Sequence, residues 1–481
     1  MSKNIDKNEE VLTENKKWYK KVPNAYVILF MILILMSILT YIIPSGQFEM
    51  MEMPNGRMGV VPGSFQYIEK TSAMKVSFFD LFRSIPTGMV EAGSVMMIVF
   101  LAGGMFRVLE KTGVIEGSIG ITVKKIEEHN LSKTVTLVIL TYLFGFFGAA
   151  VGYENLIPFV PLGVMISLGL GYDILVGASI VIGSLSVGFG LSPINPYTVG
   201  IAHSIADLPT FSGMGIRVIL TIVALAVMAH HTIRYAKKIE KDPSKSTVKH
   251  ISTEGLSIDK EHLDKYKLDK RGKVILVIFL SFIAVVVFGV VKYAWYLTEI
   301  SALFVLYAII IGIVAKFDAN KIVNTFIEGA GNIAGGALIV GFARAISVLL
   351  NQGKIADTII NALSAPLENF SPTISAILMT LVQGIINIFI PSGSGQAMVT
   401  MPIIIPLSDL IGVSRQVAVS AFQIGDGLIN MLTPTLGGLL AMLALARVPF
   451  DKWFKFILPL VLKLYVIGWI FLAAVTAINW Q

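Results

Sequence analysis

Two carboxylic acids, Glu154 and Asp426, lie in or beside long stretches of the sequence that contain no basic residue. Residues 134–216, which include Glu154, have no Lys or Arg, and neither do residues 355–414, which end shortly before Asp426. An acid at bilayer depth costs about 2.5–3.5 kcal/mol or more unless it is paired or hydrated. No basic residue nearby in the sequence can supply that pairing. We therefore expect these acids to meet a cation: Na⁺, a proton, or a positively charged group of a substrate.

The acids belong to four segments in which Gly, Pro and Ser interrupt an otherwise apolar sequence. These segments are VGYENLIPFVP (151–161), FGLSPINP (189–196), IPSGSGQAMVTMP (390–402) and IGDGLINMLTPT (424–435). Irregular backbone at membrane depth must be buried in protein or line a polar cavity. We therefore predict that the four segments meet at one site, where helix N-termini face an anionic group and free carbonyls face a cation. The predicted substrate-binding residues are Glu154, Asn155, Ser192, Asn195, Ser392, Ser394, Gln396, Asp426, Asn430 and Thr433.

A structural role is the alternative for each of these residues. Asp426 could accept hydrogen bonds from backbone N–H groups or pair with a base from another helix, and Glu154 could cap a helix. Small and amide side chains commonly join membrane helices to one another. Four interruptions in one chain favour a shared binding site over so many separate structural roles.

The composition is that of a multi-spanning membrane protein. Hydrophobic residues make up 55% of the 481 residues and charged residues only 14%, and a spanning helix needs about 20 apolar residues. Apolar runs occur near residues 24–43, 87–107, 214–236, 273–291, 298–315, 328–350 and 455–477. Together with the segments around the breaks, they predict an all-α polytopic membrane fold of about 9–10 full spans plus two re-entrant hairpins.

Charge and cysteine content narrow the function. The net charge of +7 could suggest a nucleic-acid partner, but Lys and Arg gather in the N-terminal tail, around 124–133 and across 234–273. These segments are loops, and the positive-inside rule places them in the cytoplasm. We therefore expect a protein of the bacterial cytoplasmic (inner) membrane, with its N-terminus inside and no nucleic-acid partner. The chain has no cysteine, which excludes disulfides and thiolate metal sites.

The two halves of the chain repeat the same helix-breaking landmarks. The matched positions are each 241 residues apart: Gly152 and Gly393, Pro161 and Pro402, Gly171 and Gly412, and Pro193 and Pro434. The charged loops give the two copies opposite directions, so we predict inverted repeats related by a twofold axis in the membrane plane. In each repeat we expect a re-entrant hairpin and then a discontinuous helix, because Pro removes a backbone donor and clashes with the preceding turn.

These landmarks set the predicted boundaries. The chain is divided into a cytoplasmic tail (1–23), a first half (24–236), a basic cytoplasmic linker (237–272) and a second half (273–481). The repeat cores are 81–209 and 322–449, the hairpin tips are 151–161 and 390–402, and the helix breaks are 189–196 and 424–435. We also predict an outside loop at about 44–80 and a cytoplasmic amphipathic helix at 114–130.

The sequence does not complete an enzymatic motif. SGSGQA lacks the Lys of a phosphate-binding loop, and no H-x-x-x-H or carboxylate-rich metal cluster occurs. We predict no catalytic residue and no cofactor; Na⁺ at carbonyls near the hairpin tips, or coupling to Na⁺ or H⁺, stays open. The enzymatic alternative is an intramembrane serine protease with a Ser394–His203 dyad, which leaves the repeated breaks unexplained. We expect His203 to be a hydrogen-bonded packing residue and Arg344 to snorkel or pair structurally.

The chain resembles the YfcC family, relatives of the anaerobic C4-dicarboxylate carriers within the ion-transporter superfamily. The likeness is carried by GYENLIPFVPLG, FGLSPINPYTVGIAH, IPSGSGQAMVTMPI and QIGDGLINMLTPTLGG. The resemblance implies an elevator-type secondary carrier, usually a homodimer, with a scaffold domain and a mobile domain that holds the hairpins. It also implies an antiporter of basic amino acids, of the arginine–ornithine type.

The residues themselves favour a positively charged substrate, because the predicted site is acidic and has no Lys or Arg. We expect the substrate carboxylate to meet the Ser-rich tip near Ser394, and its ammonium or guanidinium to meet Asp426 or Glu154. The sequence thus predicts a secondary active transporter, not an enzyme, that exchanges basic amino acids. The alternatives are an ion-coupled carrier of C4-dicarboxylates or another organic anion, and a carrier of peptides or neutral amino acids.

Overall fold

The protein is a helical membrane protein, seen here in a computed structural model. The structure describes residues 25–52, 58–61, 63–114, 117–118, 121, 132–150, 153–209, 211–253, 268–293 and 295–481. The predicted tail at 1–23 lies outside these residues, and so do most of the predicted amphipathic helix at 114–130 and the first two residues of the tip at 151–161.

The chain opens with an apolar helix, α1 (Ala25–Ile42), followed by four short strands. The strands form two antiparallel pairs, β1 (Gly46–Gln47) with β4 (Gln66–Tyr67) and β2 (Met50–Glu52) with β3 (Met58–Val60). The all-α prediction is therefore wrong for this segment. The physical reason is in the sequence between β2 and β3, which contains Asn-Gly, a strong signal for a β-hairpin. A 3₁₀ turn, η2 (Ser72–Met74), leads to the next helix.

The rest of the first half contains helices, of which the longest is α10, and α10 ends in a basic segment. They are α2 (Phe78–Glu91), α3 (Gly93–Glu110), α5 (Lys133–Ala150), η3 (Tyr153–Phe159), α6 (Val160–Gly169), α7 (Ile174–Ala178), η4 (Ser179–Gly183), α8 (Ser184–Gly190), η5 (Pro196–Gly200), α9 (Ile201–Ile205), α10 (Met214–Lys241) and η6 (Pro243–Lys245).

The regular elements described in the second half are all helices. Its helices are α11 (Lys270–Tyr293), α12 (Leu297–Val314), α13 (Ala319–Asn332), α14 (Ala334–Gly353), α15 (Ala356–Ser364), η8 (Ala365–Asn369), α16 (Pro372–Phe389), α17 (Gly393–Leu410), α18 (Arg415–Ile429), α19 (Gly437–Leu445) and α20 (Phe450–Ala477).

Helix caps recur at the sequence offset of 241. Ser77 caps α2 and Asp318 caps α13, while Asp173 caps α7 and Ser414 caps α18. In each case a side-chain oxygen accepts a hydrogen bond from a backbone N–H of the first turn, which satisfies a donor that has no partner within the helix. The caps of these equivalent helices are therefore separated by the same 241 residues as the matched Gly and Pro positions.

Two glycines at this offset make equivalent turns. Gly171 follows α6 with a φ of 89°, and Gly412 follows α17 with a φ of 72°. This left-handed backbone favours glycine because it has no Cβ. The residue after each glycine donates its N–H back into the helix, Tyr172 to the Ser167 carbonyl at 2.9 Å and Val413 to the Ser408 carbonyl at 2.8 Å. Such bonds close the C-terminus of a helix.

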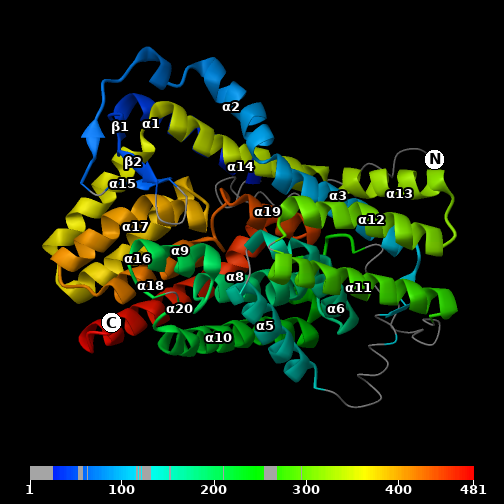
Figure 1. Cartoon of the computed structure of the whole chain (residues 1–481). Helices are drawn as coiled ribbons and strands as arrows, with labels where there is room; N and C mark the ends of the chain where they lie inside the picture. The colour runs from blue at the N-terminus through cyan, green and yellow to red at the C-terminus, as the bar shows by residue number, and fades with distance from the viewer. Residues whose placement is uncertain are drawn as a thin grey trace, which may run out of the picture.

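Helices of one half pack against helices of the other. α2 contacts α14 and α3 contacts α13, so each pair draws one helix from each half; Figure 1 shows α3, α12 and α13 side by side. In the middle of the molecule α8 meets α18 backbone to backbone, since a Cβ built on Gly427 would lie 1.9 Å from the Cα of Gly190. α5 packs on α8 and α16 on α18, which surrounds this central contact.

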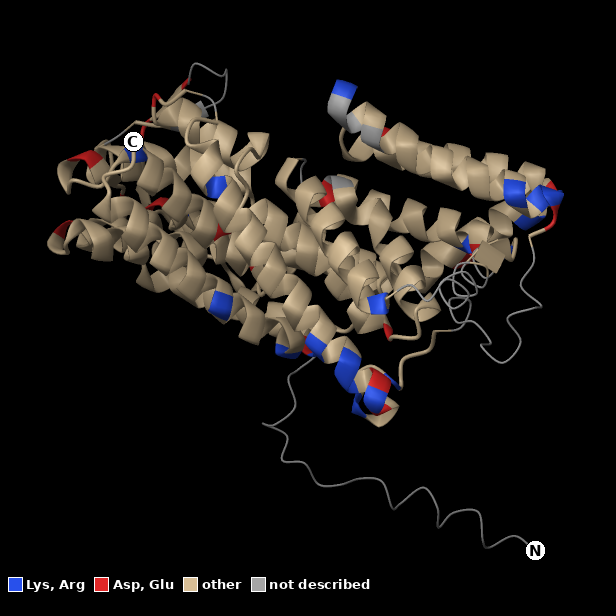
Figure 2. Ribbon diagram, turned by 90° about the horizontal axis from the view of Figure 1, so that it is seen from below, with Lys and Arg blue, Asp and Glu red and all other residues tan. Residues whose placement is uncertain are grey.

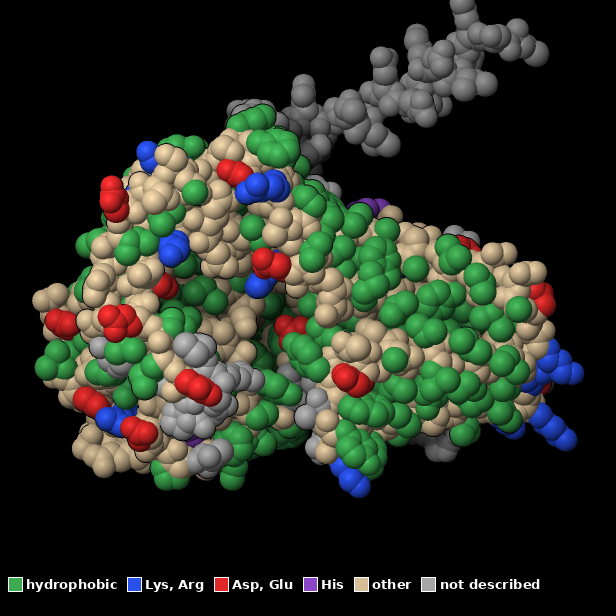
Figure 3. Space-filling model, turned by 45° about the horizontal axis from the view of Figure 1, so that its top comes forward, with side chains coloured by type: hydrophobic (Ala, Val, Ile, Leu, Met, Phe, Trp, Pro, Cys, Tyr) green, Lys and Arg blue, Asp and Glu red, His purple; other side chains and the backbone are tan. Residues whose placement is uncertain are grey.

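Seven of the described helices are long and apolar enough to cross a membrane. They are Gly93–Glu110, Lys133–Ala150, Met214–Lys241, Leu297–Val314, Ala334–Gly353, Pro372–Phe389 and Phe450–Ala477. Three shorter apolar helical stretches, Tyr26–Ile42, Leu156–Gly169 and Ile174–Gly190, accompany them in the described part of the chain, and the count of 9–10 full spans stays a prediction. Most Lys and Arg lie near helix ends and loops (Figure 2), and hydrophobic side chains cover much of the face in Figure 3.

Some predicted boundaries are displaced. The irregular tip predicted at 390–402 covers only 390–392, because α17 continues through Pro402, and the break predicted at 424–435 begins only after Ile429. A proline removes one helical hydrogen bond, and the bonds on either side can carry the helix past it.

The basic linker is shorter than 237–272, since α10 reaches Lys241 and α11 begins at Lys270. Lysine favours helix formation, so α10 extends into the basic segment, and Pro243 prevents it from continuing further.

Two apolar runs that the sequence presents as single spans are each divided in two. The run at 87–107 is divided at Ala92, between α2 and α3, and the run at 328–350 is divided at Ile333, between α13 and α14. Both residues leave helical geometry, with ψ near 7° and 10°. Neither is Gly or Pro, so composition carries no signal for these two bends.

Candidate functional site

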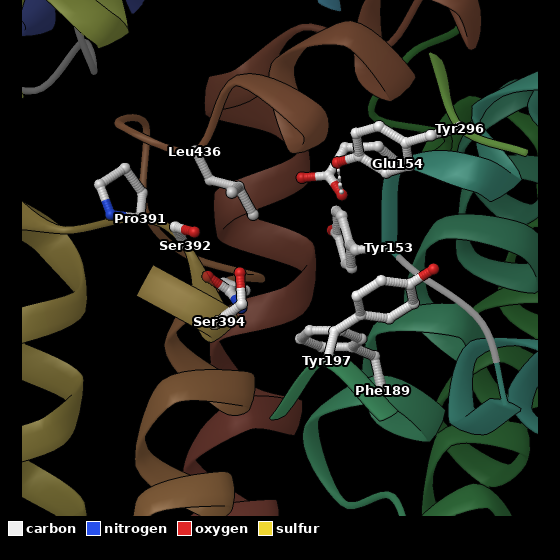
Figure 4. Close-up of a pocket in the computed structure, with 11 residues that line it drawn as sticks. Tyr153, Glu154, Phe189, Tyr197, Tyr296, Pro391, Ser392, Ser394 and Leu436 are labelled. Atoms are coloured by element: carbon white, nitrogen blue, oxygen red, sulfur yellow. Dashed lines mark hydrogen bonds between the residues drawn. The ribbon is translucent and has the colours of Figure 1, made fainter. Parts of the chain in front are cut away.

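A pocket of about 420 Å³ lies where the four interrupted segments come together. Its lining residues come from all four segments, from the residues directly after two of them, and from the residue just before α12: Tyr153, Glu154, Phe189, Tyr197, Tyr296, Pro391, Ser392, Gly393, Ser394, Asn430 and Leu436. Figure 4 shows the tip at 391–394 on one side of the pocket, with Glu154 and three tyrosines on the other. This volume lies within the usual range of small-ligand sites.

The tip at 391–394 presents the N-terminus of a long helix to the pocket. α17 begins at Gly393, and the Oγ of its cap, Ser392, accepts a hydrogen bond from the Gly395 N–H at 3.3 Å. The first N–H groups of an α-helix lack partners within the helix and carry its positive dipole end. The N-terminus of α17, with the hydroxyls of Ser392 and Ser394 beside it, is therefore suited to bind an anionic group such as a carboxylate.

The opposite wall is acidic and aromatic. Glu154, in η3, is half-buried, and its Oε2 accepts a hydrogen bond from the Tyr296 hydroxyl at 3.4 Å. The rings of Tyr153 and Phe189 meet edge to face with centroids 5.5 Å apart, and Tyr197 completes this wall. No Lys or Arg is among the described residues that line the pocket. A carboxylate beside aromatic faces favours a cationic group.

Asp426 lies behind the tip rather than in the pocket wall. It is fully buried on α18, and its Oδ1 accepts a hydrogen bond from the Asn387 side-chain amide at 2.7 Å. A Cβ built on Gly393 would lie 3.2 Å from Asp426 Oδ2 and 2.6 Å from the Thr198 methyl group. Only a glycine at the start of α17 allows the tip to approach this carboxylate so closely.

Several buried oxygens around Asp426 have no hydrogen-bond partner among the described residues. They include Asp426 Oδ2, Thr198 Oγ1, Asn387 Oδ1 and Asn430 Oδ1. A buried polar atom left without a partner costs about 1–3 kcal/mol. A set of acceptor oxygens with one carboxylate is the kind of environment that a proton or a hard cation stabilises.

The other predicted site residues hold the interrupted backbone in place. Ser192 Oγ donates to the Ala149 carbonyl at 2.7 Å, and Asn195 Oδ1 accepts from the Tyr197 N–H at 2.9 Å, which caps η5. Gln396 donates to the Gln383 side chain at 2.7 Å, and Thr433 bonds to Thr435 at 2.8 Å. The side chain of Asn155 lies outside the description. Of the ten predicted residues, Glu154, Ser392, Ser394 and Asn430 line the pocket.

Sequence reasoning missed the aromatic and apolar part of the lining. Tyr153 directly precedes the predicted Glu154, and Tyr197 directly follows the predicted break at 189–196, so attention to aromatic neighbours of the breaks would have found them. Tyr296 comes from the segment before α12, far from any break in the sequence, and no pattern indicates it. Phe189, Pro391, Gly393 and Leu436 complete the lining.

His203 is not available as the general base that a serine protease with Ser394 would need. Both ring nitrogens of His203 are occupied: Nδ1 accepts from the Phe211 N–H at 2.9 Å, and Nε2 contacts the Arg217 guanidinium at 3.1 Å. His203 is thus a hydrogen-bonded packing residue, as predicted. Arg344 forms an ion pair with Glu91 at 2.8 Å, which confirms its structural pairing.

The chain also matches known proteins over nearly its whole length. Residues 22–477 match the family described as "DcuC: C4-dicarboxylate anaerobic carrier". The chain belongs to this family. A relative in Escherichia coli, YfcC, which is provisionally named a basic amino acid antiporter, is 30% identical over 92% of this chain and 94% of its own length. An uncharacterized protein of Haemophilus influenzae is 29% identical over 95% of this chain and 97% of its own.

Two solved structures share a lower level of similarity with this member of the carrier family. The YdaH transporter of Alcanivorax borkumensis has a TM-score of 0.43 at 14% identity and covers 95% of this chain and 99% of its own. MtrF of Neisseria gonorrhoeae, described among antimetabolite efflux pumps, has a TM-score of 0.41 at 19% identity, with 95% of both chains covered. Membership of a carrier family, together with seven apolar helices, makes the protein a multi-pass membrane transporter.

Proposed function

We propose that this carrier exchanges basic amino acids, of the arginine and ornithine type, across the bacterial inner membrane. The observation that carries the proposal is the pocket in which a helix N-terminus faces Glu154 and several aromatic rings, with no Lys or Arg among its described lining residues. The name of the relative YfcC points to the same substrate class.

A basic amino acid uses both walls of this pocket. Its α-carboxylate binds the α17 N-terminus between Ser392 and Ser394, where a helix dipole and free N–H groups favour an anion. Its cationic side chain lies against Tyr153 and Tyr197 and reaches Glu154. The α-ammonium group then lies on the side of Asn430, whose buried Oδ1 lacks a partner in the described part of the chain.

A C4-dicarboxylate, which the family description names, fits less well. One of its carboxylates can take the place of the amino acid carboxylate at the α17 N-terminus. The other carboxylate would then lie beside Glu154, and two neighbouring negative charges repel each other. Family membership alone therefore does not decide the substrate.

The two repeats run in opposite directions, as the sequence predicts, and the contacts at α10 support this. Near its start, Arg217 donates to Gln416 in the first turn of α18 at 3.1 Å. Near its end, Tyr235 donates to Asp173, the cap of α7, at 2.8 Å. These contacts are about 27 Å apart at 1.5 Å per residue, close to the thickness of the hydrocarbon core. The equivalent helices α7 and α18 therefore begin on opposite sides of the membrane.

Transport proceeds by an elevator mechanism in a homodimer, which the family resemblance implies. The mobile domain comprises the two tips and the two broken helices, which contact one another through α8 and α18. α2, α3, α13 and α14, which pack across the halves, form the scaffold. Asp426, with its unpartnered Oδ2, is the group that takes up a proton or Na⁺ when the tip closes.

The experiment is counterflow in liposomes. The purified protein is reconstituted in liposomes loaded with ornithine, and entry of labelled arginine is measured against empty liposomes. We expect arginine entry to require internal ornithine. Entry of labelled succinate with Na⁺, without arginine entry, would assign the carrier to dicarboxylates instead.

A further inference from the structure

A second pocket, of about 480 Å³, lies between α10 and α20, and five Lys and Arg residues line it, together with His231. Arg234 and Lys238 come from α10, and Lys452, Lys455 and Lys463 come from α20. Its floor is apolar and includes Leu175, Phe456 and Pro459. The proposed transport cycle uses none of these residues.

The positive charges of this basic pocket are largely without counter-charge. Lys452 lies 3.6 Å from Asp451. Arg234, Lys238, Lys455 and Lys463 have no acidic partner within 4.0 Å among the described residues. Cations gathered this closely repel one another unless an anion lies between them.

An acid near the floor, Asp173, is already satisfied by neutral donors. Asp173 accepts hydrogen bonds from the Tyr235 hydroxyl at 2.8 Å, the Ser246 hydroxyl at 2.6 Å and the backbone N–H groups of Leu175 and Val176. These bonds fix Asp173 beneath the pocket and leave the lysines on its rim free to bind another anion.

The pocket lies where two membrane-spanning helices reach the surface of the bilayer. α10 and α20 each have 28 residues, about 42 Å at 1.5 Å per residue, which exceeds a hydrocarbon core of about 30 Å. Lys452 and Lys455 lie in the first two turns of α20, and Lys238 lies in the last turn of α10. These side chains therefore reach the level of the lipid headgroups.

Lys463 gives the strongest indication of what binds there. It lies deeper in α20 and is exposed, with Leu462 and Val466 beside it 58% and 49% exposed. Those two apolar side chains face lipid in a membrane-spanning helix. A lysine on a lipid-facing surface is costly unless its chain snorkels toward the headgroups or meets an anion.

We propose that this basic pocket binds the phosphate headgroup of an anionic phospholipid. The phosphate lies among Lys238, Lys455 and Lys463, and the acyl chains extend along the exposed apolar face of α20 at Leu462 and Val466. Basic pockets between membrane helices are suited to such headgroups. The bound lipid joins α10, on which the two repeats meet, to α20.

The test measures lipid binding by native mass spectrometry of the purified full-length protein. Phosphatidylglycerol is titrated against the protein in neutral detergent, with phosphatidylcholine as the neutral lipid. We expect phosphatidylglycerol to bind, and the double variant Lys455→Gln/Lys463→Gln to bind it about 30-fold more weakly. This factor corresponds to about 2 kcal/mol, because each basic residue near an anionic headgroup contributes about 1 kcal/mol. Arg234→Gln/Lys238→Gln tests the α10 wall in the same way.

Lys237→Gln is the matched control, because Lys237 is exposed on α10 next to Lys238 but does not line the pocket. It should bind phosphatidylglycerol as the unaltered protein does. Equal weakening by Lys237→Gln, or undiminished binding by both double variants, would overturn the site. Full displacement of the lipid by an equal concentration of inorganic phosphate would assign the pocket to a soluble anion and overturn the lipid. Monodisperse elution of each variant checks that it folds.

Discussion

At the scale of single residues, Glu154 is the acid that faces the pocket. Changing Glu154 to Gln keeps the size of the side chain and its hydrogen bond with Tyr296 but removes the charge. A hydrogen bond to a charged group contributes about 1.5–3 kcal/mol. We therefore expect the apparent KM for arginine to rise about 10- to 100-fold, measured as arginine–ornithine exchange in liposomes.

Glu368→Gln is the matched control for Glu154→Gln, since Glu368 is exposed in η8 and does not line the pocket. Its KM for arginine should stay unchanged. An unchanged KM in Glu154→Gln as well would place the cation of the substrate elsewhere.

Asp426 is a second residue whose charge can be removed without changing its shape. Asp426→Asn keeps the Oδ1 acceptor for Asn387 and takes an unpaired charge out of a fully buried position. We expect exchange to fall to the background of empty liposomes while the melting temperature stays the same or rises. Normal exchange by this variant would mean that Asp426 is structural.

At the scale of elements, the start of α17 depends on Gly393. In Gly393→Ala the added methyl group would lie 2.6 Å from Thr198 Cγ2, so the tip must move away from Asp426. We expect loss of exchange with little loss of stability, measured by counterflow and by thermal unfolding. Gly335→Ala is the control, because no atom outside its own helix lies within 4 Å of the added methyl group. Full exchange by Gly393→Ala would show that the tip need not close on Asp426.

The turn at Gly412 tests the backbone instead of the site. The nearest atom to a Cβ built there is Pro372 Cγ, at 3.9 Å, so Gly412→Ala meets no clash but must adopt a φ of 72°. We expect a loss of about 1–2 kcal/mol in unfolding free energy. Denaturant unfolding in detergent measures it, with Gly215→Ala in α10 as a control that should not destabilise. Equal stability of Gly412→Ala would refute the strained turn.

Several elements could be predicted from sequence because their signals are local. Gly and Pro indicate the turn at Gly412 and the break around Pro193. The bends at Ala92 and Ile333 are not predicted, because neither residue is Gly or Pro and the sequence around each is apolar enough to suggest one continuous span. Pro402 indicates a break where the structure has a helix, since neighbouring hydrogen bonds continue past it.

At the scale of the whole molecule, the opposite orientation of the repeats can be tested by labelling. The chain has no cysteine, so single substitutions give no background. Leu410→Cys lies at the end of α17 and is 73% exposed, and Lys245→Cys lies in the basic segment after α10. A membrane-impermeant maleimide added to intact cells should label Leu410→Cys at once and Lys245→Cys only after lysis. Labelling of both positions from the same side would contradict inverted repeats.

The meeting of four segments at one pocket follows from sequence, while its chemistry follows only in part. The breaks indicate where backbone is irregular, and irregular backbone in a membrane must line a cavity. Glu154 and Ser394 lie inside two of these breaks, so the sequence alone predicts that both line the cavity. The aromatic wall depends on Tyr296, which only the fold brings to the pocket, so this part of the proposed cation site could not be predicted from the sequence.

The most direct measurement is an experimental structure of the carrier with arginine bound. We expect ligand density in the pocket, with the carboxylate at the N-terminus of α17 beside Ser392 and Ser394 and the guanidinium beside Glu154. Density for arginine outside this pocket, or density in the pocket with succinate but none with arginine, would contradict the proposed site and substrate.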